Sequence, residues 1–233
     1  MPGLRSLTSF KVMTFDVVGT LIDFETGMLD YLRTSGAAPA PVSDTVILDV
    51  YRAARGAAKT LLYPDDLERC YGDLVRHAGL VDVPALARGF RDSAEFWPAF
   101  PDSVAALKRL AGRYRLVAMT NAQRWALDHF TRTLGHPFWD TVCVDDSLTE
   151  KPDPVFFGFA RGRISRSGFV QSDILHVAQS QYHDIGIAKQ LGYTTCWIER
   201  RKGLGAGGTI KAAEITRPDY HFSTLAELAD LAA

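Results

Sequence analysis

Hydrophobic positions along the chain form short unbroken apolar runs separated by longer segments with helical spacing. The runs that indicate buried strands are 11–18, 114–121, 140–146, 173–180 and 193–199. Helical segments lie between the later runs, at 102–112, 123–134, 153–163 and 183–191. Strands that alternate with helices of this length indicate βαβ units and a parallel sheet. We therefore predict an α/β fold with a Rossmann-like parallel sheet as its core.

Residues 27 to about 98 follow a different pattern, in which helical segments occur without clear strands. These segments are 27–35, 44–61, 66–78 and 84–96, and the proline-containing stretch 96–103 is typical of a return hinge. We predict a helical cap domain of residues 26–98, inserted into a core of residues 1–25 and 99–233. Such a cap would lie over the carboxyl ends of the strands, where parallel sheets bind ligands.

Composition narrows the class of protein. The 233 residues include 26 Lys and Arg against 27 Asp and Glu, a formal charge of −1, which argues against a nucleic-acid surface. No apolar run approaches the roughly 20 residues of a membrane helix, and the N-terminus lacks a secretion signal. Three widely spaced cysteines are typical of reduced thiols, so we expect a cytoplasmic protein. The glycine-rich stretch 200–219 lacks phosphate-loop spacing and indicates a surface loop.

Candidate chemistry lies where the predicted strands end. Asp16 follows "VMTF", Thr120 and Asn121 follow "VAM", Lys151 precedes a proline, and Asp184 lies in the turn after "HVAQS". Each has a simpler interpretation, as a turn residue, a helix cap or a solvated charge. Because the carboxyl ends of parallel strands meet at one edge, we expect these side chains to cluster there.

Together these segments resemble the haloacid dehalogenase superfamily in the order of its four motifs. The resemblance is closest to type II 2-haloacid dehalogenases, which open with "FDxYGTL" where this chain has "FDVVGTL". The stretches "HVAQSQYHD", "WIERR" and "PDYHFSTLAELA" extend it. It implies that Asp16 is a nucleophile, that Lys151 keeps Asp16 ionised, and that Asp184 positions Lys151 and helps to activate water.

Val18 favours a dehalogenase over a phosphatase. In the superfamily's phosphatases this position is usually an aspartate that protonates the leaving alkoxide. Losing a positioned general acid costs roughly 10²–10⁴ in rate, but a halide leaves without a proton. Gln179 is neutral where the phosphatases have an acidic residue. We therefore expect a 2-haloacid hydrolase that works through an aspartyl ester, releases a 2-hydroxyacid and halide, and needs no metal or other cofactor.

The resemblance also suggests substrate contacts. Thr20, Thr120 and Asn121 would hold the substrate carboxylate or the developing oxyanion. Gln179 and Gln181, on either side of Ser180, stand where dehalogenases often have Ser and Asn, and Phe157 stands near a usual tyrosine. Either Arg52 or Arg55, three apart on one helix face, would cradle the halide, although both could be solvated charges. His183, beside Asp184, would assist proton transfer or have a structural role.

Other functions stay open. One is hydrolysis of a C–N bond in a strained ring acid, and another is a magnesium-dependent phosphatase. A third is a small-molecule binding protein on a retired enzyme core, which the retention of Asp16 and Lys151 fits poorly. We expect a small 2-halocarboxylate as the partner, without nucleic acid or membrane, and the resemblance makes a homodimer formed through the cap plausible.

Overall fold

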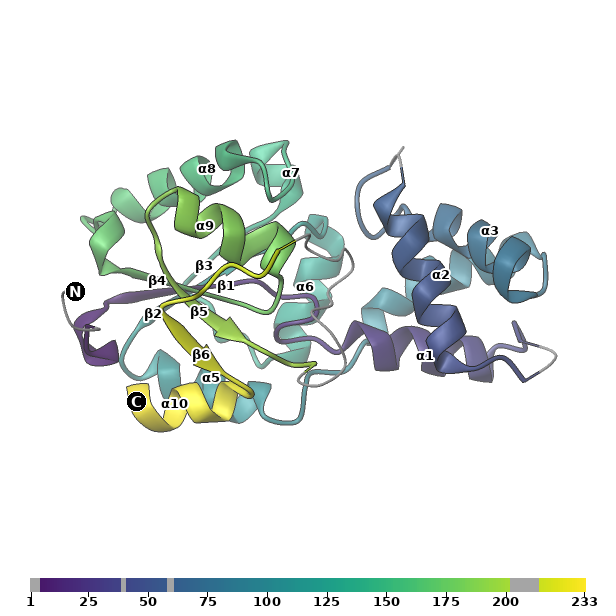
Figure 1. The fold of residues 1–233 in the computed structure, drawn as a ribbon, viewed down its shortest axis with the longest axis horizontal. Helices are drawn as coiled ribbons and strands as arrows, with labels where there is room; N and C mark the ends of the chain where they lie inside the picture. The colour runs from purple at the N-terminus through teal and green to yellow at the C-terminus, as the bar shows by residue number, and fades with distance from the viewer. Residues whose placement is uncertain (1–4, 39–40, 58–60, 202–213) are drawn as a thin grey trace.

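A parallel sheet forms the core of the chain, of which the computed structural model describes residues 5–38, 41–57, 61–201 and 214–233. Within these residues the sheet has six strands, in the order β3, β2, β1, β4, β5, β6 (Figure 1). All neighbouring pairs are parallel. The strands are β1 Val12–Phe15, β2 Arg115–Met119, β3 Asp140–Val142, β4 Ile174–Ala178, β5 Thr194–Ile198 and β6 Tyr220–Phe222. The α/β prediction is confirmed.

The strand order reverses direction beside β1. From β1 the chain moves outward through β2 to β3, then returns to β4 on the other side of β1 and continues to β5 and β6. Open α/β sheets bind ligands in the crevice at such a switch point, beyond the carboxyl ends of the strands. The turns after β1 and β4 border this crevice.

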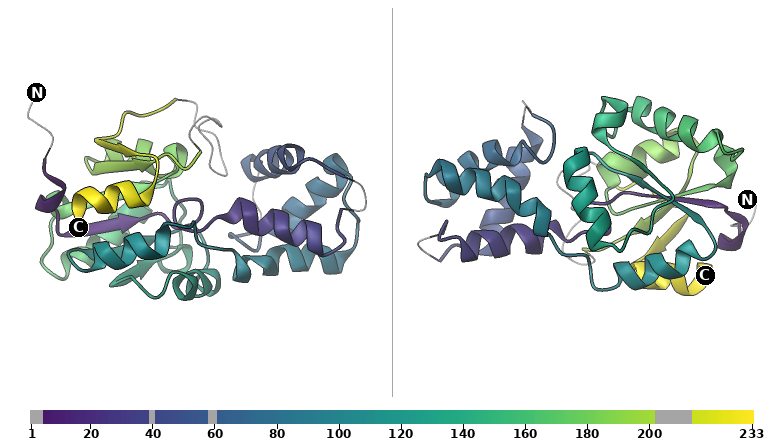
Figure 2. Two further views of the ribbon diagram at one scale, coloured as in Figure 1. Left: turned by 90° about the horizontal axis from the view of Figure 1, so that it is seen from below. Right: turned by 180° about the vertical axis from the view of Figure 1, so that it is seen from behind.

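Helices cover both faces of the sheet because successive strand residues point to opposite faces. Met13 and Phe15 pack into the larger apolar cluster, whereas Val12 packs into the smaller one. Helices α5 Ser103–Ala111, α6 Arg124–Thr133 and α10 Leu225–Ala232 contribute to the larger cluster. Helices α8 Pro154–Ser165 and α9 Gly186–Gln190 contribute to the smaller one. The result is a three-layer core (Figure 2).

A helical group lies between β1 and β2 in the chain and beside the strand ends in space (Figures 1 and 2). It consists of α1 Phe24–Thr34, α2 Asp44–Gly56, α3 Leu67–Ala78, α4 Pro84–Asp92 and the 3₁₀ helix η2 Ser93–Phe96. Within the described residues, none of the helices could cross a membrane, since all are too short or too polar. The predicted domain boundaries at 26 and 98 stay a prediction.

Two chain segments join the helical group to the core, and they are hydrogen-bonded to each other. Ile22 and Ala99 form an antiparallel bridge, and the Asp23 N–H donates to the Pro98 carbonyl at 2.8 Å. Trp97 is fully buried and stacks on Phe130 of α6. The predicted hinge segment therefore packs as part of the core.

Some local predictions differ from the structure. Strand β6 was not predicted, because three residues with His221 at their centre are too short to form an apolar run. The predicted strand 140–146 ends at Val142, since helix α7 Val144–Ser147 follows directly. The predicted helix 44–61 ends at Gly56. Most of the predicted loop 200–219 lies outside the described residues.

Candidate active site

The turn after β1 fixes the carboxylate of Asp16. Gly19 adopts a φ of 87°, a conformation that favours glycine, and this turns the chain back so that Thr20 reaches Asp16. The Thr20 hydroxyl donates to Asp16 Oδ2 at 2.7 Å and accepts from the Gln179 N–H at 2.9 Å. Only 7% of Asp16 is exposed. Asp16 is therefore held on one oxygen by its own turn.

Lys151 lies between two carboxylates. Its ammonium nitrogen is 2.9 Å from Asp16 Oδ1, 2.7 Å from Asp184 Oδ1 and 2.7 Å from the Met119 carbonyl oxygen. These contacts use the three donors of the ammonium group. The Asn121 side chain fixes the Lys151 backbone, accepting from its N–H at 2.7 Å and donating to its carbonyl at 2.8 Å. The motif after β2 therefore orients the lysine.

Asp184 lies in a single π-helical turn, η4 Gln181–Ile185, after β4. Such turns occur frequently at functional sites. Its Oδ1 accepts from Lys151 and lies 3.1 Å from His176 Nε2, while His176 Nδ1 lies 2.9 Å from the Thr14 hydroxyl. A buried hydrogen-bonded chain thus runs from Asp16 through Lys151, Asp184 and His176 back to β1.

Burial and the central cation act in opposite directions on the two carboxyl groups. Burial raises the pKa of Asp16 above its ordinary value, although the Lys151 charge opposes the shift. Burial also acts to raise the pKa of Asp184, but Lys151 and His176 outweigh it and lower that pKa to about 2. Despite its burial, Lys151 has a raised pKa because it faces both carboxylates. Asp184 is therefore the strongly ionised partner, and Asp16 is the more basic carboxylate.

The depressed pKa of Asp184 predicts an acid-sensitive fold. The unfolded carboxyl has a pKa of about 3.9, so its contribution is complete above that pH and is lost as pH falls toward 2. The expected contribution is about 2–3 kcal/mol, since each unit of pKa shift corresponds to roughly 1.4 kcal/mol. Urea unfolding of the wild type and Asp184→Asn from pH 5 to 2 measures it. As pH falls, the free energy of unfolding should decrease more steeply for the wild type, by a slope that corresponds to about one additional proton bound on unfolding. Parallel curves for the two proteins would contradict the prediction.

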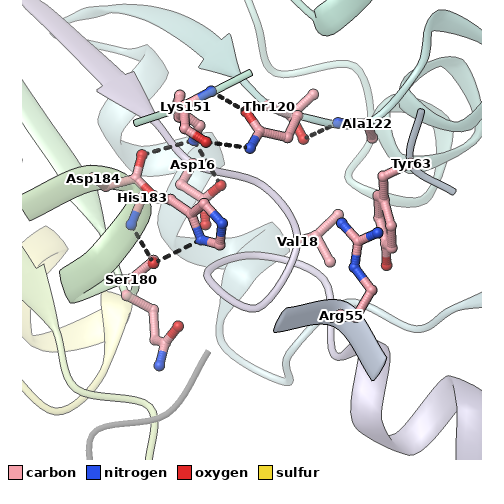
Figure 3. Close-up of a pocket in the computed structure, with 12 residues that line it drawn as sticks. Asp16, Val18, Arg55, Tyr63, Thr120, Ala122, Lys151, Ser180, His183 and Asp184 are labelled. Carbon is pink, nitrogen blue, oxygen red and sulfur yellow. Dashed lines mark hydrogen bonds and ion pairs between the residues drawn. The ribbon is translucent and has the colours of Figure 1, made fainter. Parts of the chain in front are cut away.

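A small cavity of about 40 Å³ opens onto these groups (Figure 3). One water needs about 10–15 Å³ on this scale, so the cavity suits a molecule of a few non-hydrogen atoms. The wall that the described residues form consists of Asp16, Val18, Arg55, Tyr63, Thr120, Asn121, Ala122, Lys151, Gln179, Ser180, His183 and Asp184. It joins the ends of β1, β2 and β4 to the helical group.

The helical group closes the cavity through Arg55 and Tyr63. The Tyr63 carbonyl accepts from the Gln123 N–H at 2.7 Å, which joins this segment to the start of α6. Arg55 is buried, donates to Asp66 at 2.6 Å, and lies over the Tyr63 ring at 4.7 Å. The cavity therefore has carboxylates and a lysine at its base, and a guanidinium and a phenol ring on the opposite wall (Figure 3).

Four residues that the sequence assigns to substrate binding are not among the described residues of the wall. Thr20 is fully buried beneath Asp16. The Arg52 guanidinium pairs with Glu25 at 2.7 Å and with Asp49. The side-chain oxygen Oε1 of Gln181 accepts from the Thr216 N–H, and buried Phe157 packs against His176. Their side chains have partners elsewhere in the structure, and their assignment as substrate contacts stays a prediction.

Sequence reasoning missed Tyr63 and gave no role to His176. Tyr63 lies in "LLYPDD", which matches none of the motifs considered in the sequence. It reaches the cavity only because the helical group docks on the core. His176 had a usable signal, because a histidine inside the apolar run "ILHVA" requires a buried partner. His183 does reach the cavity, with Nδ1 3.1 Å from the Ser180 hydroxyl oxygen.

The described wall of the cavity offers few anionic ligands to a divalent cation. Asp16 and Asp184 are the only carboxylates among these wall residues, and both already accept from Lys151, at 2.9 and 2.7 Å. Gln179 adds no negative charge to the wall. Elsewhere in the described part of the chain, no cluster of three or more His, Cys, Asp or Glu side chains has the arrangement of a metal site.

A parallel sheet whose first strand ends in an aspartate, facing a lysine and a second aspartate, is the arrangement expected of a haloacid dehalogenase-like hydrolase. The sequence model of the haloacid dehalogenase-like hydrolases matches residues 10–192, most of the chain. The chain therefore belongs to this family of hydrolases. A search of curated proteins finds no match.

Solved structures of similar fold include both dehalogenases and a magnesium-bound hydrolase. The L-2-haloacid dehalogenase from Xanthobacter autotrophicus with chloropropionic acid covalently bound is 17% identical, with 95% of this chain and 98% of that chain covered and a TM-score of 0.74. The HAD-hydrolase YfnB from Bacillus subtilis bound to magnesium is 20% identical (96% and 98%, TM-score 0.75). The defluorinating L-2-haloacid dehalogenase Rha0230 is 20% identical (98% and 99%, TM-score 0.76). At these identities the likeness establishes the fold alone.

Proposed function

We propose that the protein hydrolyses the carbon–halogen bond of small 2-haloacids through an ester on Asp16. The observation that carries the proposal is Val18, which lines the cavity beside Asp16 and has no titratable group. A substrate with a basic leaving group would need a proton there, worth roughly 10²–10⁴ in rate. A halide needs none, so an apolar wall at this position costs a dehalogenase nothing.

In the first step, an Asp16 carboxylate oxygen attacks the substrate carbon that bears the halogen. A carbon–oxygen bond forms as the carbon–halogen bond breaks, and the halide takes the electron pair. Lys151 favours the ionised nucleophile through its charge. Burial makes the same carboxylate more basic by raising the pKa of Asp16, which increases its reactivity once it is ionised.

In the second step, water attacks the carbonyl carbon of the Asp16 ester and the 2-hydroxyacid leaves. Asp184 accepts one proton from the water and passes it to the departing oxygen of the product. The second water proton leaves Asp16 for solvent, which restores the carboxylate. Thr120 and Asn121 line the cavity and would hold the substrate carboxylate, Asn121 through the amide hydrogen that is not donated to Lys151. Lys151 remains protonated throughout and balances the charge that develops on Asp16.

Arg55 is the better candidate for the halide contact. It lines the cavity and is almost fully buried, whereas the Arg52 guanidinium is committed to Glu25 and Asp49. A partly desolvated guanidinium attracts an anion more strongly than a solvated one. Its ion pair with Asp66 at 2.6 Å partly neutralises that charge. The halide would therefore bind weakly enough to leave after the reaction.

Halide release is the direct test of this function. We expect the protein to release halide from 2-chloro-, 2-bromo- or fluoroacids of two or three carbons, with the same rate in excess EDTA. Ion chromatography of halide and of the 2-hydroxyacid, measured together, should give equal amounts. Phosphate release from an aryl phosphate that requires Mg²⁺ would instead support a phosphatase. No halide from any acid in the panel would refute the proposal.

A further inference from the structure

We infer that His176 is a positioning residue that holds Asp184 in the orientation needed to hydrolyse the Asp16 ester. The inference rests on the proposed function, because it assigns His176 to the second step of that reaction. His176 is fully buried in β4 and is absent from the described cavity wall. Its ring therefore acts through Asp184, which lines the cavity.

The hydrogen bonds determine which ring nitrogen carries hydrogen. Asp184 Oδ1 is an ionised acceptor, because Lys151 is 2.7 Å from the same oxygen. A bare Nε2 at 3.1 Å would place two acceptors against each other, so Nε2 must be an N–H donor. The Thr14 hydroxyl, 2.9 Å from Nδ1, completes the ring's contacts. Thr14 thereby holds the imidazole in the plane that reaches Asp184.

These bonds make the two oxygens of Asp184 inequivalent. Oδ1 accepts hydrogen bonds from both Lys151 and His176. Oδ2 is buried and has no hydrogen-bond partner among the described residues. Turning the carboxylate out of this orientation would break both bonds at once. His176 thus keeps Oδ2 as the free acceptor, and a buried carboxylate oxygen without a partner favours a hydrogen bond from water.

The step follows with its atoms balanced. Oδ2 of Asp184 takes one proton as the water oxygen bonds to the ester carbonyl carbon of Asp16. The tetrahedral intermediate then breaks its bond to the substrate oxygen, and that oxygen takes the proton from Asp184. The second water proton remains on Asp16, which releases it to solvent and becomes a carboxylate again. Formation of the ester, by contrast, needs no base. His176 should therefore affect ester hydrolysis and not ester formation.

Single-turnover kinetics of His176→Phe separate these steps. We expect halide release in the first turnover to stay within about threefold of the wild type, and ester hydrolysis to slow by about 10²-fold, the usual lower value for a general base. Intact-mass spectrometry should show the ester accumulating on the protein. His176→Gln, whose carboxamide can donate a hydrogen bond to Asp184, should recover part of the hydrolysis rate.

Matched variants in the sheet control for packing. Thr14→Val should slow ester hydrolysis less than His176→Phe does, since it removes only the support of the ring. Thr195→Val makes the same change in β5, where the hydroxyl binds Asp219, and should alter neither step. An equal fall in both steps, or unchanged hydrolysis in a folded His176→Phe protein, would overturn the inference.

Nitrogen NMR of the imidazole tests the arrangement without activity. The spectrum of the wild type should show a hydrogen on Nε2 of His176, and Asp184→Asn should shift that resonance. A bare Nε2 would overturn the inference even in an active enzyme. Wild-type protein that releases no halide, yet shows this protonated Nε2, would refute the proposed function and leave the positioning of Asp184 standing.

Discussion

Asp16→Asn is expected to abolish halide release, by about 10⁴-fold or more, because removing a covalent nucleophile leaves only binding and electrostatic effects. The amide is nearly the same size as the carboxylate and can still accept from Thr20, whose hydroxyl lies 2.7 Å from Asp16 Oδ2. The fold should therefore persist. Initial rates of halide release and circular dichroism measure the two effects.

A second aspartate in the same segment supplies the control. Asp23 is the N-cap of α1, accepting from the Thr26 N–H, and asparagine caps helices about equally well. Asp23→Asn should retain activity. One turnover of the wild type in ¹⁸O-labelled water should give a product whose new oxygen is unlabelled, because that oxygen comes from Asp16. Full activity of Asp16→Asn, or labelled product in the first turnover, would exclude the ester.

The sequence predicted the core because five short apolar runs, nearly unbroken, are separated by segments with helical spacing. That pattern is local, so it can be recognised in the sequence without knowledge of tertiary contacts. Strand β6 has only three residues and one exposed histidine, so its pairing with β5 is a tertiary effect that local patterns do not carry. The helical insertion was visible from the absence of strands between 27 and 98.

The convergence of Asp16, Lys151 and Asp184 was predicted from strand ends in a parallel sheet, and the structure brings the three together. The opposite wall was harder to predict. Arg52 and Arg55 share a helix face. Only the docking of α2 determines that Arg52 pairs with Glu25 while Arg55 lines the cavity. Tyr63 depends on the same docking. The sequence pattern of the helical group contains no information on how the group docks on the sheet. Sequence alone therefore does not predict which of its residues reach the cavity.

Lys151→Met should produce the largest loss of stability among single changes in the site. It removes the cation between Asp16 and Asp184 and leaves two buried carboxylates without their common partner. Breaking a buried ion pair in this way costs about 3–5 kcal/mol. Urea unfolding measures the loss, and halide release should fall with it because the Asp16 carboxylate takes up a proton.

Lys189→Met provides the matched control, because Lys189 pairs with Asp219 at 2.8 Å in a partly exposed position. Exposed pairs contribute roughly 0–1 kcal/mol, so this variant should lose little. The comparison separates loss of a buried cation from loss of a lysine. Equal losses in the two variants would contradict a central role for Lys151.

The deficit of Lys151→Met should depend on pH in a defined direction. Without the ammonium, one of the two facing carboxyl groups acquires a folded pKa above the unfolded value of about 3.9. Such a group binds more protons in the folded state, so the destabilisation is small near pH 4 and grows as pH rises to that folded pKa. Adding Asp184→Asn removes one of the two anions and should restore part of the stability. A deficit that is constant across pH, or a double variant whose losses simply add, would show that the two carboxylates are not coupled through Lys151.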